Sequence, residues 1–321
     1  MILAVFAASL LTAVIGAILL IPRLHRARIV GKDMHKLGKP PVAEMGGLAI
    51  VAGTGVGISV ALAMMSFFHV LQDASVVLLL AALAVILLTG LIGIIDDLLG
   101  MRQLVKAFLP AMAALPLVAV RAGQTLFLIP FMGRINFWIF YPLFLVPAGV
   151  MVAANAVNML AGFNGVEVGM GLVAMGSLAV IAAAVHQTTA LIILLSGAGA
   201  LLGILFFNWY PAKIMIGDVG TLSIGALIAT AVIVGNFETA GVIVIIPYAI
   251  DFLFKAAHGF PKSFGELRSD GKLHCPGCSA VGLGQFIMKI TGGIKERSLT
   301  ITLMGIEAVF GGLAILLYVW R

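Results

Sequence analysis

Ten segments of mostly apolar residues recur along the chain, and each approaches the roughly 20 residues that a helix needs to cross a bilayer. Hydrophobic residues make up 62% of the 321 residues and charged residues 10%, whereas soluble domains carry roughly 25% charge. The sequence therefore predicts an all-α polytopic membrane protein, formed as a single integral membrane domain over residues 1–321. The predicted spans are 2–22, 46–69, 74–95, 104–121, 138–158, 168–186, 189–208, 219–235, 240–258 and 298–320.

The first span also indicates how the chain is oriented. No basic residue precedes its apolar run, and Arg23, Arg26 and Arg28 follow it. A secretory signal peptide has the opposite charge order, so we expect a retained span with the N-terminus outside. In that orientation the inner side holds all Lys and Arg residues but three, which is the bias of cytosolic loops. The three exceptions are Arg121, Arg134 and Arg321.

The acidic residues gather on the same side, although Asp and Glu do not normally follow that bias. Only Asp73, Glu238 and Glu307 lie elsewhere. A transporter of an anionic solute would need polar groups through the middle of the membrane, and Glu307 is the one residue that favours this alternative. The pattern favours a catalytic site on the cytosolic face instead, and residues 259–297 are expected to form a cytosolic loop between the ninth and tenth spans.

Two adjacent carboxylates, Asp96 and Asp97, follow the third span in "GLIGIIDDLLG". A charge in hydrocarbon costs about 2.5–3.5 kcal/mol on insertion scales, so this pair indicates a function. Neighbours on a helix point about 100° apart, which predicts two different roles for the two acids. Lys106 follows near the start of the next span, where it is well placed to hold a phosphate.

Later spans carry polar residues at their inner ends as well. Asn155 and Asn158 are one helical turn apart in "NAVNMLAGFNGVEVG" and share a face. Asn164 opens a turn signal, and Glu167 follows it. Asp218 is an acid flanked by apolar residues and glycines, which favours a functional role near the membrane.

A few carboxylates with an amide suit Mg²⁺ bridging a phosphorylated substrate, and Mn²⁺ is an alternative. The lysines suit phosphates and the apolar spans suit a lipid co-substrate, so we expect metal-assisted phosphoryl transfer at the membrane surface. A membrane prenyltransferase would use similar groups, but it would need spaced acids such as D-x-x-D, which "DDLLG" lacks. Cys275 and Cys278 form one "CPGC" pair beside His274, and a zinc site would need further ligands.

In this order, the motifs "DD", "NAVNMLAGFNGVEVG" and "NWYPAKIMIGDVGTLSIGA" resemble those of the polyprenyl-phosphate N-acetylhexosamine-1-phosphate transferase family. The resemblance covers nearly the whole chain, and the tail "GGIKERSLTI" is similar to the dolichyl-phosphate GlcNAc branch of that family. It implies ten spans, a cytosolic site, and transfer of a sugar 1-phosphate from a UDP-N-acetylhexosamine to a polyprenyl or dolichyl phosphate, with release of UMP. No nucleic acid partner is expected, and relatives suggest a homodimer.

The resemblance also implies roles for individual residues. Asn158 and Asp218 match the magnesium ligands, and Lys106 matches the lysine near the phosphates. Asp96 and Asp97 match the paired acids, for which a base on the lipid phosphate and a metal ligand, Asp97 in particular, both stay open. Asn164 with the backbone of Gly46 and Gly47 matches a uracil site. The expected substrate-binding residues are Glu44, Gly46, Gly47, Asn164, Glu167, Met215, Lys262, Arg268 and His274.

Two departures from the family pattern bear on the donor. Met215 stands where a similar member has an aromatic ring on uracil, and methionine can pack on a ring. Bacterial enzymes that carry the peptidoglycan precursor show a run of histidines in the last inner loop, where this chain has only His274. We therefore expect GlcNAc as the sugar, with a phospho-MurNAc-pentapeptide transferase as the alternative. The expected location is the plasma membrane, in the first membrane step of glycan assembly.

Overall fold

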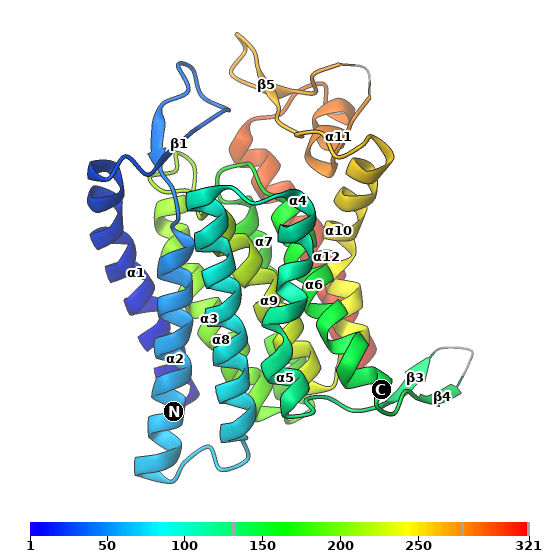
Figure 1. Ribbon diagram of the computed structural model, residues 1–321. Coiled ribbons are helices and arrows are strands. Elements are labelled where there is room, and N and C mark those ends of the chain that lie inside the picture. Colours follow the sequence, from blue (N-terminus) through cyan, green and yellow to red (C-terminus); the bar gives the residue numbers. More distant parts are fainter. Residues whose placement is uncertain (130–132, 278, 320–321) are drawn as a thin grey trace.

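The computed structural model describes residues 1–129, 133–277 and 279–319, which form a bundle of long helices with three short hairpins (Figure 1). Within these residues, nine helical stretches are long and apolar enough to cross a membrane. This confirms the all-α membrane architecture. The nine are α1 (Ile2–Arg26), α2 (Gly47–Phe68), α3 (Val76–Leu99), the π-helical turn η1 (Tyr141–Leu145) continued by α6 (Val146–Leu160), α7 (Val166–Ala184), α8 (Thr188–Asn208), α9 (Gly217–Gly235), α10 (Glu238–Ala257) and α12 (Glu296–Val319).

The span predicted at 104–121 has a different form. It is divided into α4 (Gln103–Ala113) and α5 (Leu115–Ala119), with Pro110 inside the first helix and Pro116 in the first turn of the second. Proline lacks the N–H that continues a helix, and it is tolerated where a new helix begins. The pair is shorter than the other nine, yet it carries the chain from the end of α3 to the start of η1 at the opposite end of the bundle (Figure 1).

Two helix boundaries differ from the prediction in a way that matters for the site. The sequence placed Asp96 and Asp97 in the connection after the third span, but α3 continues to Leu99, so both lie in its last turns. Gly100 ends the helix with a φ of 67°, which glycine adopts at little cost. The helix α9 begins earlier than predicted, so Asp218 lies in its first turn.

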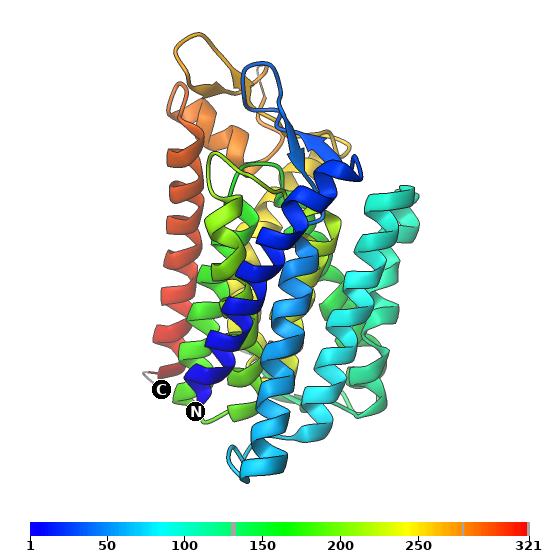
Figure 2. The same cartoon turned by 90° about the vertical axis from the view of Figure 1, so that its left-hand side faces the viewer.

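Short segments gather at one end of the bundle, called here the loop face, where α1, α3, α6, α8 and α10 end and α2, α4, α7, α9 and α12 begin (Figure 1). The loop face carries the hairpins β1 (Val30–Lys32) with β2 (Pro41–Ala43) and β5 (Glu266–Leu267) with β6 (Leu273–His274), and the helix α11 (Leu283–Ile290). Figure 2 shows the start of α1 and the end of α12 at the opposite end, where the hairpin of β3 (Leu126–Ile129) and β4 (Gly133–Asn136) also lies in Figure 1.

The helix α9 lies at the centre of the bundle. Every residue from Val219 to Gly235 is buried, and its neighbours include α2, α3, α6, α7 and α8. Small residues permit this packing, as is usual between membrane helices. A Cβ on Gly93 of α3 would lie 2.5 Å from the backbone N of Val219, so only glycine fits there. The central position of α9 places its N-terminal turn in the middle of the loop face.

Candidate active site

Asp218, in the first turn of α9, is the centre of a cluster of charged side chains on the loop face. The Lys106 ammonium of α4 donates to Asp218 Oδ2 at 2.6 Å and lies 2.7 Å from Asp96 Oδ2 of α3. Lys106 and Asp96 are each only 9% exposed. One buried cation therefore joins the ends of three helices and is shared between two carboxylates.

The two asparagines of α6 have different partners. Asn158 donates its Nδ2 to Asp218 Oδ1 and to Thr221 Oγ1, the second at 2.7 Å. Asn155 donates its Nδ2 to the Ala107 carbonyl oxygen at 2.8 Å, which links α6 to α4. Asn158 therefore belongs to the Asp218 cluster, whereas Asn155 has a helix-packing contact.

The adjacent aspartates point to different groups. Asp97 accepts from the backbone N–H of Asp218 at 2.9 Å and from that of Val219 at 3.2 Å, whereas Asp96 contacts Lys106. The first N–H groups of a helix have no partner within it, and an acidic side chain there also interacts favourably with the helix dipole. Asp97 thus caps α9 from another helix and fixes the position of the Asp218 side chain.

Glu44, between β2 and α2, adds a fourth carboxylate near this cluster. Burial raises the pKa of Glu44 above its ordinary value, and the negative charge of Asp218 raises that pKa further. Its carboxylate also lies against Gly31 of β1, where an added Cβ would come within 3.0 Å of Glu44 Oε2.

The oxygen atoms of this cluster suit a divalent cation such as Mg²⁺. Asp218 and Asp96 converge on one position, which the Lys106 ammonium fills at 2.6 and 2.7 Å, so this position attracts positive charge. The role of Asp218 and Asn158 as metal ligands, which the family resemblance implies, stays a prediction. Both oxygens of Asp97 are bonded to α9, and its role as a metal ligand stays a prediction.

The glycines expected at the uracil site make close backbone contacts, but with this chain's own helices. The N–H groups of Gly46 and Gly47 donate to the carbonyl oxygens of Met215 and Ile216, both at 2.8 Å. A Cβ on Gly47 would lie 2.5 Å from the Cα of Gly220. These bonds place half-buried Met215 beside the start of α2, and the uracil contacts of all three residues stay predictions.

Asn164 is fully buried and lies in a second polar cluster on the loop face. Its Nδ2 donates to Glu296 Oε1 at 2.8 Å and to Asp33 Oδ2 at 3.2 Å, and its Oδ1 accepts from the Ala212 N–H at 2.6 Å. Lys36 pairs with Asp33 at 2.5 Å and lies 3.4 Å from Asn164 Oδ1. In this arrangement the side chain of Asn164 is bonded to protein groups, and its contact with uracil stays a prediction.

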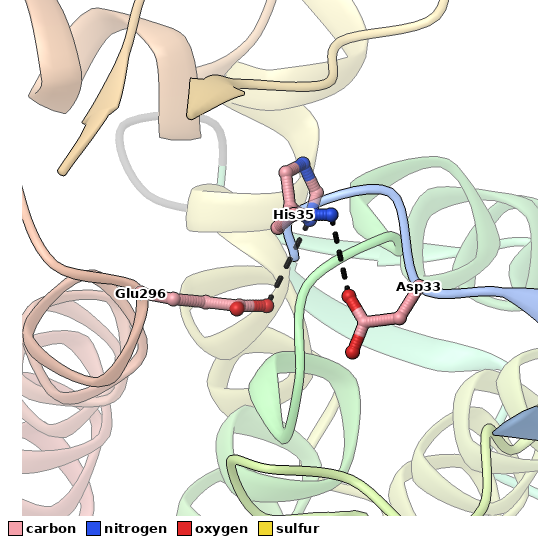
Figure 3. A group of neighbouring side chains, drawn as sticks. All are labelled: Asp33, His35 and Glu296. Atoms are coloured by element: carbon pink, nitrogen blue, oxygen red, sulfur yellow. Dashed lines mark hydrogen bonds and ion pairs between the residues drawn. The ribbon is translucent and has the colours of Figure 1, made fainter. Parts of the chain in front are cut away.

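Three members of the second cluster were not singled out from the sequence: Asp33, His35 and Glu296. They offer three ligand atoms that lie within 4.8 Å of one another, and all three residues are buried (Figure 3). In the sequence, "GKDMHK" reads as a basic flank that anchors a helix at the membrane. The sequence signal that could have indicated this cluster is Asp33 and His35 between two lysines, together with Glu296 just before the last span.

The remaining predicted site residues are divided between the protein interior and the surface. Glu167 is buried and accepts from the Gly162 N–H at 2.5 Å, which fixes the turn before α7. Lys262 and Arg268 are exposed on the segment after α10, and His274 there contacts Asp270 at 3.0 Å. Cys275 is half-buried, whereas Cys278 lies outside the described residues.

Comparison with known proteins supports the sequence resemblance. Residues 79–236 match the model of glycosyl transferase family 4. A protein of Saccharolobus solfataricus, provisionally named UDP-N-acetylglucosamine–dolichyl-phosphate N-acetylglucosaminephosphotransferase, is 38% identical over 96% of this chain and 94% of its own length. A Dictyostelium discoideum protein of the same name is 28% identical over 90% of this chain and 80% of its own length.

A more distant similarity exists to a phospho-N-acetylmuramoyl-pentapeptide-transferase of Streptococcus pyogenes, which is 30% identical over 70% of both chains. The match to the Saccharolobus protein extends over almost the full length of both proteins. The chain therefore belongs to the polyprenyl-phosphate N-acetylhexosamine-1-phosphate transferases of glycosyl transferase family 4.

Proposed function

We propose that the protein transfers GlcNAc 1-phosphate from UDP-GlcNAc to dolichyl phosphate or a related polyprenyl phosphate. An oxygen of the lipid phosphate forms a bond to the β-phosphorus of the donor. The bond from that phosphorus to the oxygen bridging the two phosphates breaks, and UMP leaves with this oxygen. The names of the archaeal and Dictyostelium relatives support this donor and this acceptor.

The observation that carries the proposal is the Asp218 cluster. Two carboxylates, one lysine and one amide meet where four helices end or begin at the loop face. Phosphoryl transfer requires positioning and charge stabilisation more than covalent chemistry from the protein. A Mg²⁺ ion held by Asp218 and Asn158 would neutralise charge on the donor pyrophosphate.

The side chains divide this work between them. Lys106 is anchored between Asp96 and Asp218, from where its ammonium is available to the transferred phosphate. Asp97 holds the first turn of α9 and thereby the Asp218 carboxylate. The lipid phosphate is already anionic at neutral pH, so its attack needs no general base.

We further propose that the loop face lies on the cytoplasmic side of the plasma membrane. The basic residues support this orientation because most of them belong to connections at that face, as in cytosolic loops of membrane proteins. The charged and polar groups of the cluster would then meet UDP-GlcNAc in the cytoplasm, while the lipid phosphate arrives from the bilayer.

The test is UMP release by the purified protein in detergent, given UDP-GlcNAc and a polyprenyl phosphate with and without Mg²⁺. We expect release that requires both the lipid and the metal. UDP-MurNAc-pentapeptide, given in a parallel reaction, should release little UMP. If it released more UMP than UDP-GlcNAc, the assigned donor would be wrong.

A matched pair of variants assigns the reaction to the Asp218 cluster. Asp218→Ala should abolish magnesium-dependent release while the protein remains folded, whereas Asp73→Ala, at the opposite end of the bundle, should leave release unchanged. Asp73 is exposed and lies between α2 and α3. Wild-type turnover by Asp218→Ala would contradict the site.

A further inference from the structure

His35 is a buried histidine that joins three separate segments of the loop face. Only 3% of it is exposed. Its ring stacks on Phe163, with ring centroids 4.6 Å apart, and meets Phe264 edge-on at 5.7 Å. Its Nε2 accepts from the backbone N–H of Gly265 at 3.1 Å. The residues that it contacts belong to the turn before α7 and to the segment that follows α10.

That second segment, residues 259–277, carries Lys262, Arg268 and His274, the expected contacts of the donor sugar or pyrophosphate. Other groups of the loop face hold it as well. Gln285 of α11 donates to the Phe264 carbonyl oxygen at 2.9 Å, and Leu273 and Ile294 exchange two backbone hydrogen bonds at 2.8 and 3.0 Å. Among the hydrogen bonds of the described residues, the bond between His35 and Gly265 connects this segment to the β1–β2 region.

The hydrogen bond from Gly265 to the His35 ring indicates which ring nitrogen carries the proton. Since Nε2 accepts from Gly265, the proton of the neutral ring lies on Nδ1, which faces Glu296 Oε1 at 3.7 Å (Figure 3). Burial lowers the pKa of His35 to about 4, although the charge of Asp33 raises it. At neutral pH the ring is therefore uncharged. It accepts a hydrogen bond from the Gly265 amide, and its Nδ1 lies near the Glu296 carboxylate without a hydrogen bond to it.

A metal ion is the competing explanation for these three side chains. Glu296 Oε2 is buried and has no hydrogen-bond partner in the described part of the chain, which leaves it available to a cation. Two observations weigh against this explanation. The Nδ1 atom that would bind the metal carries the proton in the tautomer that Gly265 selects, and Lys36 already neutralises Asp33 at 2.5 Å.

A cavity of about 440 Å³ lies beside His35, and residues of the docked segment line it as well. His35 and Glu296 form one wall, and Leu267, Gly271 and Leu273 of the segment form another. The shape of this cavity therefore depends on where the segment is held. It is held at Leu273 by the backbone of Ile294 and at Gly265 by His35.

We propose that His35 is a positioning residue that docks residues 259–277 on the loop face and thereby sets the affinity for the nucleotide-sugar donor. The proposal rests on the proposed function for the identity of that donor. In this proposal the ring acts through the Gly265 N–H and the rings of Phe163 and Phe264.

The test compares His35→Phe with His35→Gln in the full chain. Phenylalanine keeps a ring for Phe163 but removes the acceptor for the Gly265 N–H, whereas glutamine keeps an acceptor. We expect His35→Phe to raise the KM for UDP-GlcNAc about tenfold, as the loss of one buried hydrogen bond implies. The kcat and the KM for the polyprenyl phosphate should not change, and His35→Gln should restore most of the donor affinity.

A second readout does not depend on activity. Backbone hydrogen exchange of residues 262–275 should be faster in His35→Phe than in wild type, while exchange in α9 stays the same. His25→Phe, at an exposed histidine near the end of α1, is the control and should change neither readout. Should His35→Phe fail to fold, Gln285→Leu releases the segment at Phe264, the residue beside Gly265, and the same two measurements apply.

Three results would overturn the proposal. One is unchanged exchange of residues 262–275 in His35→Phe, and another is faster exchange with an unchanged donor KM. The third is a tightly bound metal ion in the wild type, at one equivalent by elemental analysis, that His35→Phe loses. Failure of the proposed function would differ from all three, because the wild type would then release no UMP while the exchange comparison still reported on the docking.

Discussion

Lys106 and Asp218 are 112 positions apart in the chain, and their charged groups meet at 2.6 Å. The contact joins α4 to the central helix α9, and Asp96 of α3 completes it from the other side. A local motif carries each of these residues, but only the packing of the three helices makes them one site.

Lys106→Met should remove both stability and activity. It would leave Asp96 and Asp218 buried with no shared cation, and breaking a buried ion pair in this way costs about 3–5 kcal/mol. We expect the loss of an anchored cation at the phosphates to reduce kcat at least 100-fold. Thermal unfolding in detergent and UMP release measure the two effects, and Lys32→Met, at an exposed position on β1, is the control. A variant that retained half of the wild-type kcat would contradict the assigned role.

Asp97 offers a test that separates a helix cap from a general base. Asp97→Asn keeps an oxygen for the Asp218 N–H, whereas Asp97→Ala keeps none, so alanine should cost about 1–2 kcal/mol of unfolding free energy and asparagine much less. If Asp97 acts by holding α9, the asparagine variant should also retain far more UMP release than the alanine variant. Equal and nearly complete loss in both variants would instead indicate that the charged carboxylate of Asp97 takes part directly, as a base or as a metal ligand.

The sequence predicts the residues of the Asp218 cluster more fully than those of the His35 cluster, for a physical reason. Asp96, Asn158 and Asp218 are polar residues at the ends of apolar runs, and the cost of placing them there marks them as functional. His35 lies in a basic connection, where a polar residue costs nothing in an unfolded or solvated loop. Its burial depends on Phe163 and Phe264, which approach it only in the folded chain.

The sequence alone could not show what the backbone of Gly46 and Gly47 contacts, because that depends on how the helices pack. Gly46 and Gly47 were interpreted as an opening for a ligand, and the structure gives their N–H groups to the carbonyl oxygens of Met215 and Ile216. A glycine pair at a helix start predicts a close neighbour, but not whether that neighbour is a ligand or another helix.

The stability of the protein should depend on pH through His35. Burial lowers the pKa of this residue from 6.5 to about 4, so the unfolded chain binds the proton more readily than the folded one. Stability should therefore fall as the pH decreases from about 6.5 to about 4, by about 3 kcal/mol for a shift of this size. Asp33 and Glu296 also face the ring and titrate in their own ranges, so the informative quantity is a difference between two proteins.

That difference is between wild type and His35→Gln, which has no titrating ring. Unfolding free energies in detergent at several pH values from 4 to 7 should converge for the two proteins as the pH falls. Parallel curves over this interval would show that the ring is not buried in its neutral form.

Gly47 and Gly55 lie on the same helix and provide a matched test of how the site is positioned. A Cβ on Gly47 would lie 2.5 Å from the Cα of Gly220, and backbone on α9 cannot move aside as a flexible side chain can. On Gly55 the nearest atom would be Leu83 Cδ1 at 3.6 Å, an ordinary contact.

Gly47→Ala should therefore displace α9 and with it Asp218, at a cost of about 3 kcal/mol or more in unfolding free energy and most of the UMP release. Gly55→Ala should stabilise α2 by about 0.5–1 kcal/mol, because alanine favours the helix, and leave UMP release unchanged. Equal stability of the two variants, measured by thermal unfolding, would mean that the contact between α2 and α9 does not position the carboxylate on which the proposed chemistry depends.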